Sequence, residues 1–149
     1  MRIEQATMKY LESVSALFDA YLQFYGKPSA PEAARRFIEE RLRNGDSYIA
    51  CAVADGTIAG FAQLYPSFAS LSLARCWILY DLFVAPEFRR RGAGHLLLEA
   101  AREHGIRTGA CGLTLATQIG NRAAQALYES HGWVRDQEFY HYELTLENP

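Results

Sequence analysis

The 149-residue sequence has only three cysteines, and none of them stands in a Cys-x-x-Cys pair or at a spacing typical of metal ligands. We therefore expect no disulfide framework and no cysteine metal centre. Free thiols buried in apolar strands are the prediction for all of them: Cys51, Cys76 and Cys111. Free thiols fit a reducing compartment, so the protein is predicted to be cytoplasmic. The histidines also lack metal spacing and are interpreted as surface or cap residues: His95, His104, His131 and His141.

Long apolar runs and a strong net charge are absent as well. No window approaches about 18 consecutive apolar residues, and the N-terminus lacks an apolar signal core. The net charge of −2 argues against a nucleic-acid or membrane partner bound through bulk charge. There is no internal repeat, low-complexity tract or linker, and the length suits one domain over residues 1–149.

The hydrophobic periodicity alternates between strands and helices along the chain. Helical spacing covers residues 8–25, 30–44, 93–105 and 121–131, and Gly45 and Gly132 stand where a left-handed cap would close a helix. Strand-like segments cover residues 2–7, 47–54, 57–65, 75–85, 113–117, 133–135 and 139–146. Residues 66–74 are expected to form a connection, and Asp55-Gly56 is a strong hairpin signal.

A loop rich in arginine and glycine follows the long central strand. Its sequence, residues 89–95, is Arg-Arg-Arg-Gly-Ala-Gly-His, and it opens a helical pattern. Unpaired N–H groups at a helix start, together with the helix dipole and guanidinium groups, attract an anion. Glycines let a phosphate approach the backbone. The alternative is an arginine-rich loop before a glycine-permissive helix start.

The loop is neither a Walker motif, which needs Gly-Lys-Ser/Thr, nor a dinucleotide fingerprint, because Leu97 replaces the third glycine. Its Arg-x-x-Gly-x-Gly order (Arg89, Gly92, Gly94) resembles the acetyl-coenzyme A loop of the GNAT N-acetyltransferases. Residues 121–133 resemble the second signature of that family, Asn-x(6)-Tyr followed by a Gly-aromatic pair. The resemblance runs over essentially the whole chain. It implies an α+β fold with three α/β/α layers, in which a mixed sheet of about seven strands contains a splayed parallel pair that forms the coenzyme A cleft.

The resemblance also implies a set of residues that contact acetyl-coenzyme A. Backbone groups of the strand end would contact the pantetheine arm: Leu82, Phe83 and Val84. The pyrophosphate would be held by the backbone amides of the loop: Arg90, Arg91, Gly92, Ala93, Gly94 and His95. The side chains of Arg89 and Arg91 would be its charge partners. Asn121 would bond pantetheine, Ala124 would leave room for it, and Tyr128 would donate a proton to the leaving thiolate. The alternatives are an N-cap role for Asn121 and packing for Tyr128.

The acceptor is predicted to be a primary amine, which must lose a proton before it attacks a thioester. Residues 79–84 resemble the Glu-Asp-Phe-Phe-Val stretch of diamine and polyamine acetyltransferases, although Tyr80 stands in place of the glutamate. Asp81 is the candidate base or ammonium anchor, and a structural carboxylate is the alternative. Tyr80 and Asp81 would lie on opposite faces unless a bulge intervenes. The candidate substrate-binding residues are Tyr25, Tyr65, Phe68, Tyr80 and Asp81.

The predicted activity is therefore direct transfer from acetyl-coenzyme A to a small or polyamine-like amine, with no metal and no acetyl-cysteine. Three alternatives stay open: a protein or peptide amine as acceptor, a coenzyme A-binding sensor without activity, and a nucleotide-phosphate-binding domain. The last lacks the lysine and metal-binding acids that such sites use. Dimers are common in the resembled family through the C-terminal strands, so we expect a homodimer.

Overall fold

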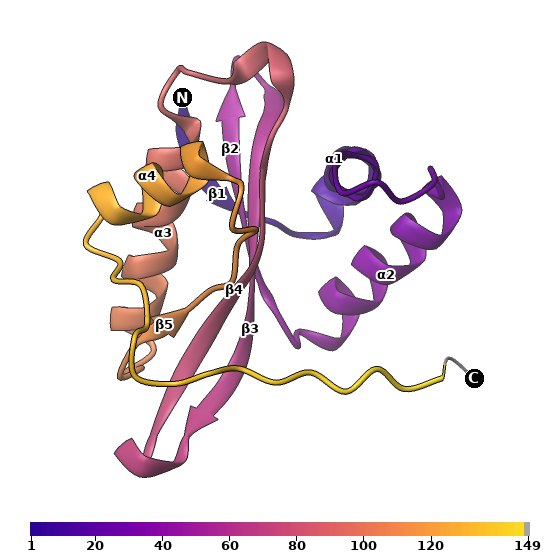
Figure 1. Cartoon of the computed structure of the whole chain (residues 1–149). Coiled ribbons are helices and arrows are strands. Elements are labelled where there is room, and N and C mark those ends of the chain that lie inside the picture. The colour runs from indigo at the N-terminus through magenta and orange to yellow at the C-terminus, as the bar shows by residue number, and fades with distance from the viewer. Residues whose placement is uncertain (148–149) are drawn as a thin grey trace.

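The computed structural model describes residues 1–147 and shows a five-stranded mixed sheet between two layers of helices (Figure 1). The strand order follows the chain, and every neighbouring pair is antiparallel except the last, β4 and β5. The strands are β1 (Arg2–Gln5), β2 (Tyr48–Ala54), β3 (Thr57–Ala69), β4 (Ala74–Val84) and β5 (Leu113–Thr114).

The helices are amphipathic and begin and end at residues that suit their positions. They are α1 (Leu11–Phe24), α2 (Pro31–Asn44), α3 (Ala93–Arg107) and α4 (Arg122–Ser130), with 3₁₀ turns η1 (Met8–Tyr10), η2 (Ser70–Ser72) and η3 (Pro86–Phe88). Pro31 lies in the first turn of α2, and Gly45 closes that helix in the left-handed conformation. In residues 1–147 we find no helix of the length and apolarity that a bilayer crossing requires.

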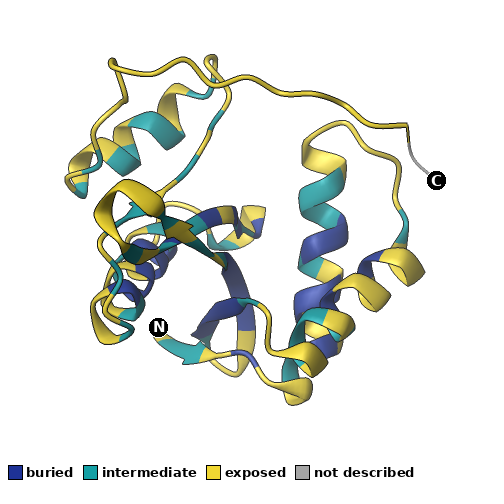
Figure 2. Ribbon diagram, turned by 90° about the horizontal axis from the view of Figure 1, so that it is seen from below, coloured by how far each residue is buried: buried dark blue, intermediate teal, exposed yellow. Residues whose placement is uncertain are grey.

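Each face of the sheet has its own hydrophobic core (Figure 2). On one face, α1 and α2 cover a cluster that includes Phe61 and Phe83. On the other face, α3 covers a cluster that includes Leu64 and Leu79. Both faces of the central strands are therefore buried, as the continuous apolar runs in their sequences predict.

A β-bulge in β4 changes which face its side chains reach. Gln63 of β3 pairs with Asp81, but the next residue of β3 pairs with Leu79, so Tyr80 has no partner in the ladder. Leu79 belongs to the α3 core, whereas Phe83 belongs to the α1 core. The extra residue thus moves the Asp81 side of the strand onto the α1 face. Strict alternation would have placed Tyr80 and Asp81 on opposite faces of the sheet unless a bulge intervened, and the structure contains that bulge.

The mixed sheet and the three layers are confirmed, but the expected seven strands are five. Residues 133–135 and 139–146 are extended without strand partners in this chain, and β5 ends at Thr114 rather than residue 117. Apolar and polar residues do alternate in these segments, but a β-strand also needs a neighbouring strand with which its backbone forms hydrogen bonds. Residues 66–69 were expected to belong to a connection, but they continue β3. They pair with the start of β4 and so form the far part of the β3–β4 hairpin.

The expected burial of the thiols and the surface role of the histidines were partly wrong. Cys51 is buried, and burial raises the pKa of its thiol to about 12. Cys76 is half-buried and Cys111 is exposed, because the start of β4 and the turn before β5 lie at the sheet margin. His104 stacks on Tyr48 with ring centroids 3.7 Å apart. Burial lowers its pKa to about 4, so it is a neutral packing residue.

We predict that Gly60→Ala destabilises the fold at the end of β4. A Cβ at Gly60 would lie 2.7 Å from the carbonyl oxygen of Phe83, a backbone atom that cannot move without shifting the strand. The expected loss is about 1–3 kcal/mol in the free energy of unfolding, measured by denaturant titration. Gly120→Ala is the control, because a Cβ there meets nothing within 4 Å. Equal stability of the two variants would contradict this role for Gly60.

Candidate active site

Asp81 is the most buried acidic residue of the described chain, with 4% of its surface exposed. The bulge directs its side chain to the α1 face, where the Nε2 of Gln63 donates a hydrogen bond of 2.8 Å to its Oδ2. The Oγ of Ser47 in turn lies 2.8 Å from the Oε1 of Gln63. A carboxylate held in this way by neutral donors keeps its negative charge free of any paired cation.

Burial raises the pKa of Asp81 above its ordinary value, and hydrogen bonds from Gln63 and the Tyr21 hydroxyl partly oppose that rise. The pKa of Tyr21 is raised as well, first by burial and then by the charge of Asp81. Tyr21 Oη also lies 3.4 Å from the carbonyl oxygen of Tyr80. A carboxylate with a raised pKa is better matched to accept a proton near neutral pH than an exposed one.

Tyrosine side chains lie in the neighbourhood of this buried carboxylate. The rings of Tyr65 and Tyr80 lie 5.5 Å apart, and those of Tyr21 and Tyr25 lie 5.0 Å apart. Burial raises the pKa of Tyr65, and the charge of Asp81 adds to the effect, which places Tyr65 near that carboxylate. The structure thus brings together four of the predicted acceptor residues: Tyr25, Tyr65, Tyr80 and Asp81.

Phe68 does not belong to this cluster. It pairs with Arg75 near the tip of the β3–β4 hairpin, five residues along β3 from Gln63, which is about 16 Å at strand spacing. Its side chain is 76% exposed. The prediction placed it in a loop beside the acceptor, whereas the long hairpin carries it away from the sheet (Figure 1).

Three residues of this network were not selected from the sequence: Ser47, Gln63 and Tyr21. Gln63 gave the clearest signal, since it is the one polar residue within the apolar run from Ile58 to Leu64. A fully buried amide in such a run needs a polar partner. Tyr21 follows ordinary helical spacing with the α1 core, so nothing in its local sequence separates it from a packing residue.

The start of α3 presents unbonded backbone donors. Gly92 is the N-cap in the left-handed conformation, with φ of 88°, and makes no side-chain cap. The first amide of this helix that bonds to a backbone carbonyl is that of Leu96, to Gly92. The amides of Ala93, Gly94 and His95 precede it, so they can serve an anion at the positive end of the helix dipole. These residues fit a diphosphate group.

The arginines of the loop have different surroundings. Nε of Arg89 donates to the carbonyl oxygen of Val84 at 2.9 Å, and its guanidinium lies over the rings of Phe24 and Phe83. Arg90 is exposed and has a positive φ of 61°. Arg91 is also exposed and lies over the Phe88 ring. All three arginines are exposed and so open to an anion, and Arg89 in addition fastens the end of β4 to α1.

Gly94 serves the contact between helices. A Cβ there would lie 3.0 Å from Cδ2 of Leu127, so the glycine allows α4 to approach α3. His95 also reaches α4, with its Nδ1 2.6 Å from Nε2 of His131. No group of three or more potential metal ligands occurs among residues 1–147.

The parallel pair β4 and β5 separates soon after it forms. Only Trp77 and Ile78 of β4 pair with β5. Leu82, Phe83 and Val84 lie beyond this pairing and bond only to β3 in the sheet. Their free edge lies between the α1 and α4 sides of the molecule. This arrangement matches the splayed pair that the resemblance implies.

On α4, the side chain of Asn121 accepts a hydrogen bond of 3.2 Å from the amide of Ala124 and so caps the helix. Tyr128 lies two turns further on, and burial raises the pKa of its phenol. The same pKa is also raised by Tyr25, so Tyr25 at the end of α1 lies in the neighbourhood of Tyr128. The phenol of Tyr128 stays protonated throughout the neutral range.

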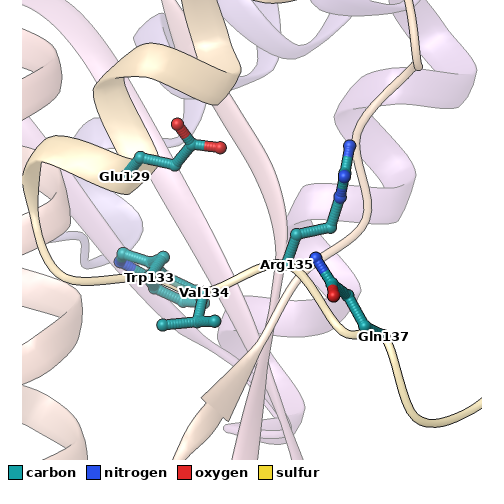
Figure 3. A pocket seen from close by; sticks show the side chains of 5 residues that line it. All are labelled: Glu129, Trp133, Val134, Arg135 and Gln137. Atoms are coloured by element: carbon teal, nitrogen blue, oxygen red, sulfur yellow. The ribbon is translucent and has the colours of Figure 1, made fainter.

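A shallow hollow of about 310 Å³ lies elsewhere, at the end of α4 (Figure 3). Its lining residues are Glu129, Trp133, Val134, Arg135 and Gln137. None of them is an acceptor or cofactor candidate. The hollow separates α4 from the start of the C-terminal segment rather than adjoining Asp81.

We predict that Gln63→Leu moves the acidic limb of the pH–rate profile to higher pH. The amide of Gln63 lowers the pKa of Asp81, so its removal leaves burial less opposed and the pKa rises further. The fraction of ionised Asp81 at a given pH then falls, and kcat/KM falls with it. Gln63→Glu is not a suitable control because it adds a charge; Ser47→Ala, one hydrogen bond further from Asp81, should shift the limb less. An unshifted limb in Gln63→Leu would contradict this role.

Comparisons with known proteins agree with this geometry. The sequence model of the acetyltransferase (GNAT) family matches residues 14–133, so the chain belongs to that family. It is 42% identical to the uncharacterized N-acetyltransferase YhfO of Bacillus subtilis, with 98% of each chain covered, and 33% identical to a probable acetyltransferase of Haemophilus influenzae, covering 98% of this chain and 99% of the relative. The crystal structure of a probable acetyltransferase, 45% identical, superposes with a TM-score of 0.94 over 100% of both chains. The protein is an acetyl-coenzyme A-dependent N-acetyltransferase.

Proposed function

We propose that this enzyme acetylates a small primary amine by direct transfer within a ternary complex. The observation that supports the proposal is Asp81, a buried carboxylate to which no cation among residues 1–147 is paired, with four tyrosines in its neighbourhood. A protonated amine is the ligand such a site favours, because the carboxylate attracts its charge and the ring faces add cation–π attraction.

Asp81 then acts on the bound amine. It accepts one proton from the ammonium group, either directly or through a water molecule, and leaves the nitrogen lone pair free. Its raised pKa makes Asp81 a stronger acceptor of that proton than an exposed carboxylate would be. Tyr21 and Gln63 hold the carboxylate in place during this step.

Acetyl-coenzyme A, when bound, supplies the thioester whose acetyl group is transferred. The amides at the start of α3 and the exposed Arg90 and Arg91 would hold its diphosphate, and the free edge of β4 at residues 82–84 would bond its pantetheine amides. Tyr128 of α4 would give its phenolic proton to the leaving sulfur, and its raised pKa supports this role because it keeps the phenol protonated. One structural relative, only 24% identical, was crystallised with a coenzyme A bisubstrate analogue.

A protein or peptide amine is the second candidate acceptor. One fold relative is a ribosomal-protein-alanine N-acetyltransferase, although it is only 17% identical. The crowding of aromatic side chains around Asp81 favours a slender amine over a folded protein surface. A coenzyme A-binding sensor without activity is the remaining alternative, and the presence of both Asp81 and Tyr128 argues against it.

The test is a thiol-release assay with acetyl-coenzyme A and a panel of amines. The panel contains linear diamines and polyamines, aminoglycosides, and peptides with a free N-terminus. We expect turnover with small amines, and initial-rate lines that intersect when both substrates are varied. Activity only on peptides would assign the second candidate, and parallel lines would contradict direct transfer. Binding of acetyl-coenzyme A without turnover of any amine would indicate the sensor; a thermal-shift titration measures this binding, since a ligand that binds the native state stabilises it.

A further inference from the structure

Aromatic side chains in the neighbourhood of the buried carboxylate come from two parts of the fold, α1 and the β3–β4 hairpin. On α1 the ring of Tyr25 lies 5.0 Å from that of Tyr21 and 5.2 Å from that of Phe24. On the hairpin the rings of Tyr65 and Tyr80 lie 5.5 Å apart. Phe24, Tyr25 and Tyr80 are all at least 38% exposed. Exposed rings near a buried charge offer contact area to the apolar body of a ligand.

Tyr65 lies on the face of the sheet that α1 and α2 cover. Phe61, Gln63 and Tyr65 alternate along β3, so their side chains share one face, and Phe61 belongs to the core under α1 and α2. The hydroxyl oxygen of Tyr21 lies 3.4 Å from the carbonyl oxygen of Tyr80. The rings of the hairpin therefore adjoin those of α1. We call this set the acceptor aromatics: Tyr21, Phe24, Tyr25, Tyr65 and Tyr80.

Two acidic residues raise the pKa values of these tyrosines, Asp81 and Asp46. Asp81 bonds to the neutral amide of Gln63 and pairs with no cation within residues 1–147. Asp46 precedes the serine that bonds to Gln63, and it accepts a hydrogen bond of 2.8 Å from Nε of Arg41. The charges of Asp46 and Arg41 act on the pKa of Tyr65 in opposite directions. The acceptor aromatics thus adjoin one unpaired negative charge and one that is already neutralised.

Arginines place positive charge at both ends of the acceptor aromatics. Arg41 acts on Tyr65 at the hairpin end. At the α1 end, the guanidinium of Arg89 lies 5.7 Å from the centre of the Phe24 ring. A ligand cation over Phe24 would compete with Arg89 for that ring. A second ammonium group at either end would therefore meet a like charge and no free carboxylate.

We propose that the acceptor is a primary monoamine with an apolar or aromatic body, an alkylamine or arylalkylamine, and that the site discriminates against diamines and polyamines. The inference rests on the proposed function, acetylation of a small primary amine, and names the class of that amine. Asp81 binds the single ammonium group, and the body of the molecule lies on the acceptor aromatics. Burial of apolar surface favours such a body, whereas burial of a second, unpaired ammonium group costs free energy.

The first test compares hexylamine with cadaverine, in which an ammonium group replaces the terminal methyl group of hexylamine at the same chain length. We expect kcat/KM at neutral pH, corrected for the two equivalent amino groups of cadaverine, to be about tenfold or more higher for hexylamine. Phenylethylamine should behave like hexylamine. Equal values, or a preference for cadaverine, would overturn the inference and leave the proposed function intact. Turnover of no amine would refute the proposed function itself, and the inference with it.

The second test removes the charge of Arg41. In Arg41→Gln the carboxylate of Asp46 loses this cation and can attract a second ammonium group. We expect kcat/KM for cadaverine to rise about two- to fivefold, while that for hexylamine stays unchanged. Arg43→Gln is the matched control, because it removes the same charge from the same helix, where Arg43 pairs with Glu39. It should change neither value. Circular dichroism reports the fold of both variants, and an unchanged preference in folded Arg41→Gln would overturn the electrostatic basis of the inference.

The third test concerns the apolar contact. Tyr80→Ala removes an exposed ring that lies outside the β4 ladder, so the variant should fold normally. We expect KM for hexylamine and phenylethylamine to rise about threefold or more with little change in kcat, because the ring contacts the body of the amine and not the reacting nitrogen. Tyr80→Phe keeps the ring and should keep the wild-type KM. A wild-type KM in Tyr80→Ala would overturn the placement of the body on these rings.

Discussion

The variant Asp81→Asn should lose about 10²–10⁴-fold in kcat/KM and keep or gain thermal stability. The amide cannot accept the proton of the ammonium group, so the chemical step fails. At the same time the variant removes a buried charge whose ionisation costs free energy, as the raised pKa of Asp81 indicates. Steady-state kinetics and a melting curve measure both effects.

The pH dependence follows with a definite sign. A carboxyl whose pKa is higher in the folded state stabilises the fold when protonated, and this contribution is lost as the pH rises through the folded-state pKa. The gain in stability of Asp81→Asn should therefore appear on the alkaline side of that pKa and vanish in acid. The acidic limb of wild-type kcat/KM should disappear in the variant. Unchanged kcat and KM would reduce Asp81 to a structural carboxylate.

Asp19→Asn is the matched control, because Asp19 is the other buried aspartate of the described chain. Its carboxylate accepts hydrogen bonds from Ser29 Oγ and the Ala30 amide, both at 2.7 Å, and so fixes the start of α2. We expect this variant to lose about 1–2 kcal/mol of stability and to keep its turnover. The two aspartates thus separate chemistry from folding.

The second large effect is expected for Tyr128→Phe, with a fall of roughly 10²-fold in kcat. The ring stays and only the hydroxyl is lost, so packing against Trp133 and binding of acetyl-coenzyme A should change little. Because burial raises the pKa of Tyr128 above the ordinary value of 10.0, ionisation of this phenol should add no alkaline limb to the wild-type pH–rate profile at neutral pH. Single-turnover thiol release measures the step.

Tyr10→Phe is the control for removal of a phenolic hydroxyl. Tyr10 bonds to Glu4 at the β1 edge, remote from α4, and its variant should keep full activity. A thiolate that is a poorer leaving group needs protonation more. The fall in kcat caused by Tyr128→Phe should therefore be larger with thioesters of less acidic thiols. If turnover of the variant matched the wild type, Tyr128 would be a packing residue, which is the alternative that its sequence position always allowed.

The sequence predicts the central part of this fold well, because the relevant signals are local. Gly45 and Gly132 cap helices where expected, Asp55-Gly56 turns a hairpin, and Gly92 opens α3. Residues 133–135 and 139–146 were predicted as strands but pair with no strand of the described chain, since an alternating pattern records a preference for a sheet and does not supply the neighbouring strand. Residues 66–69 were predicted as part of a connection, whereas they pair with β4 and extend the hairpin.

Residues of the candidate site could be predicted where they stand in a local sequence motif. They could not be predicted where their role depends on two segments that are distant in the sequence. Asp81 and Tyr128 stand in motifs, and their neighbourhood follows from the fold. Gln63 and Ser47 act on Asp81 through pairing of β3 with β4, which the sequence does not reveal. Phe68 was misplaced for the same reason, because its distance from Asp81 depends on how far the hairpin extends.

The bulge at Tyr80 has a consequence for how this enzyme can change over evolutionary time. Tyr80 lies outside the ladder, is 65% exposed, and lies next to Tyr65 in the proposed acceptor site. Its replacement alters neither the pairing frame of β4 nor the packing of either interior. Selection for a new acceptor can therefore act on this position almost without loss of stability, while Asp81 one residue away stays fixed.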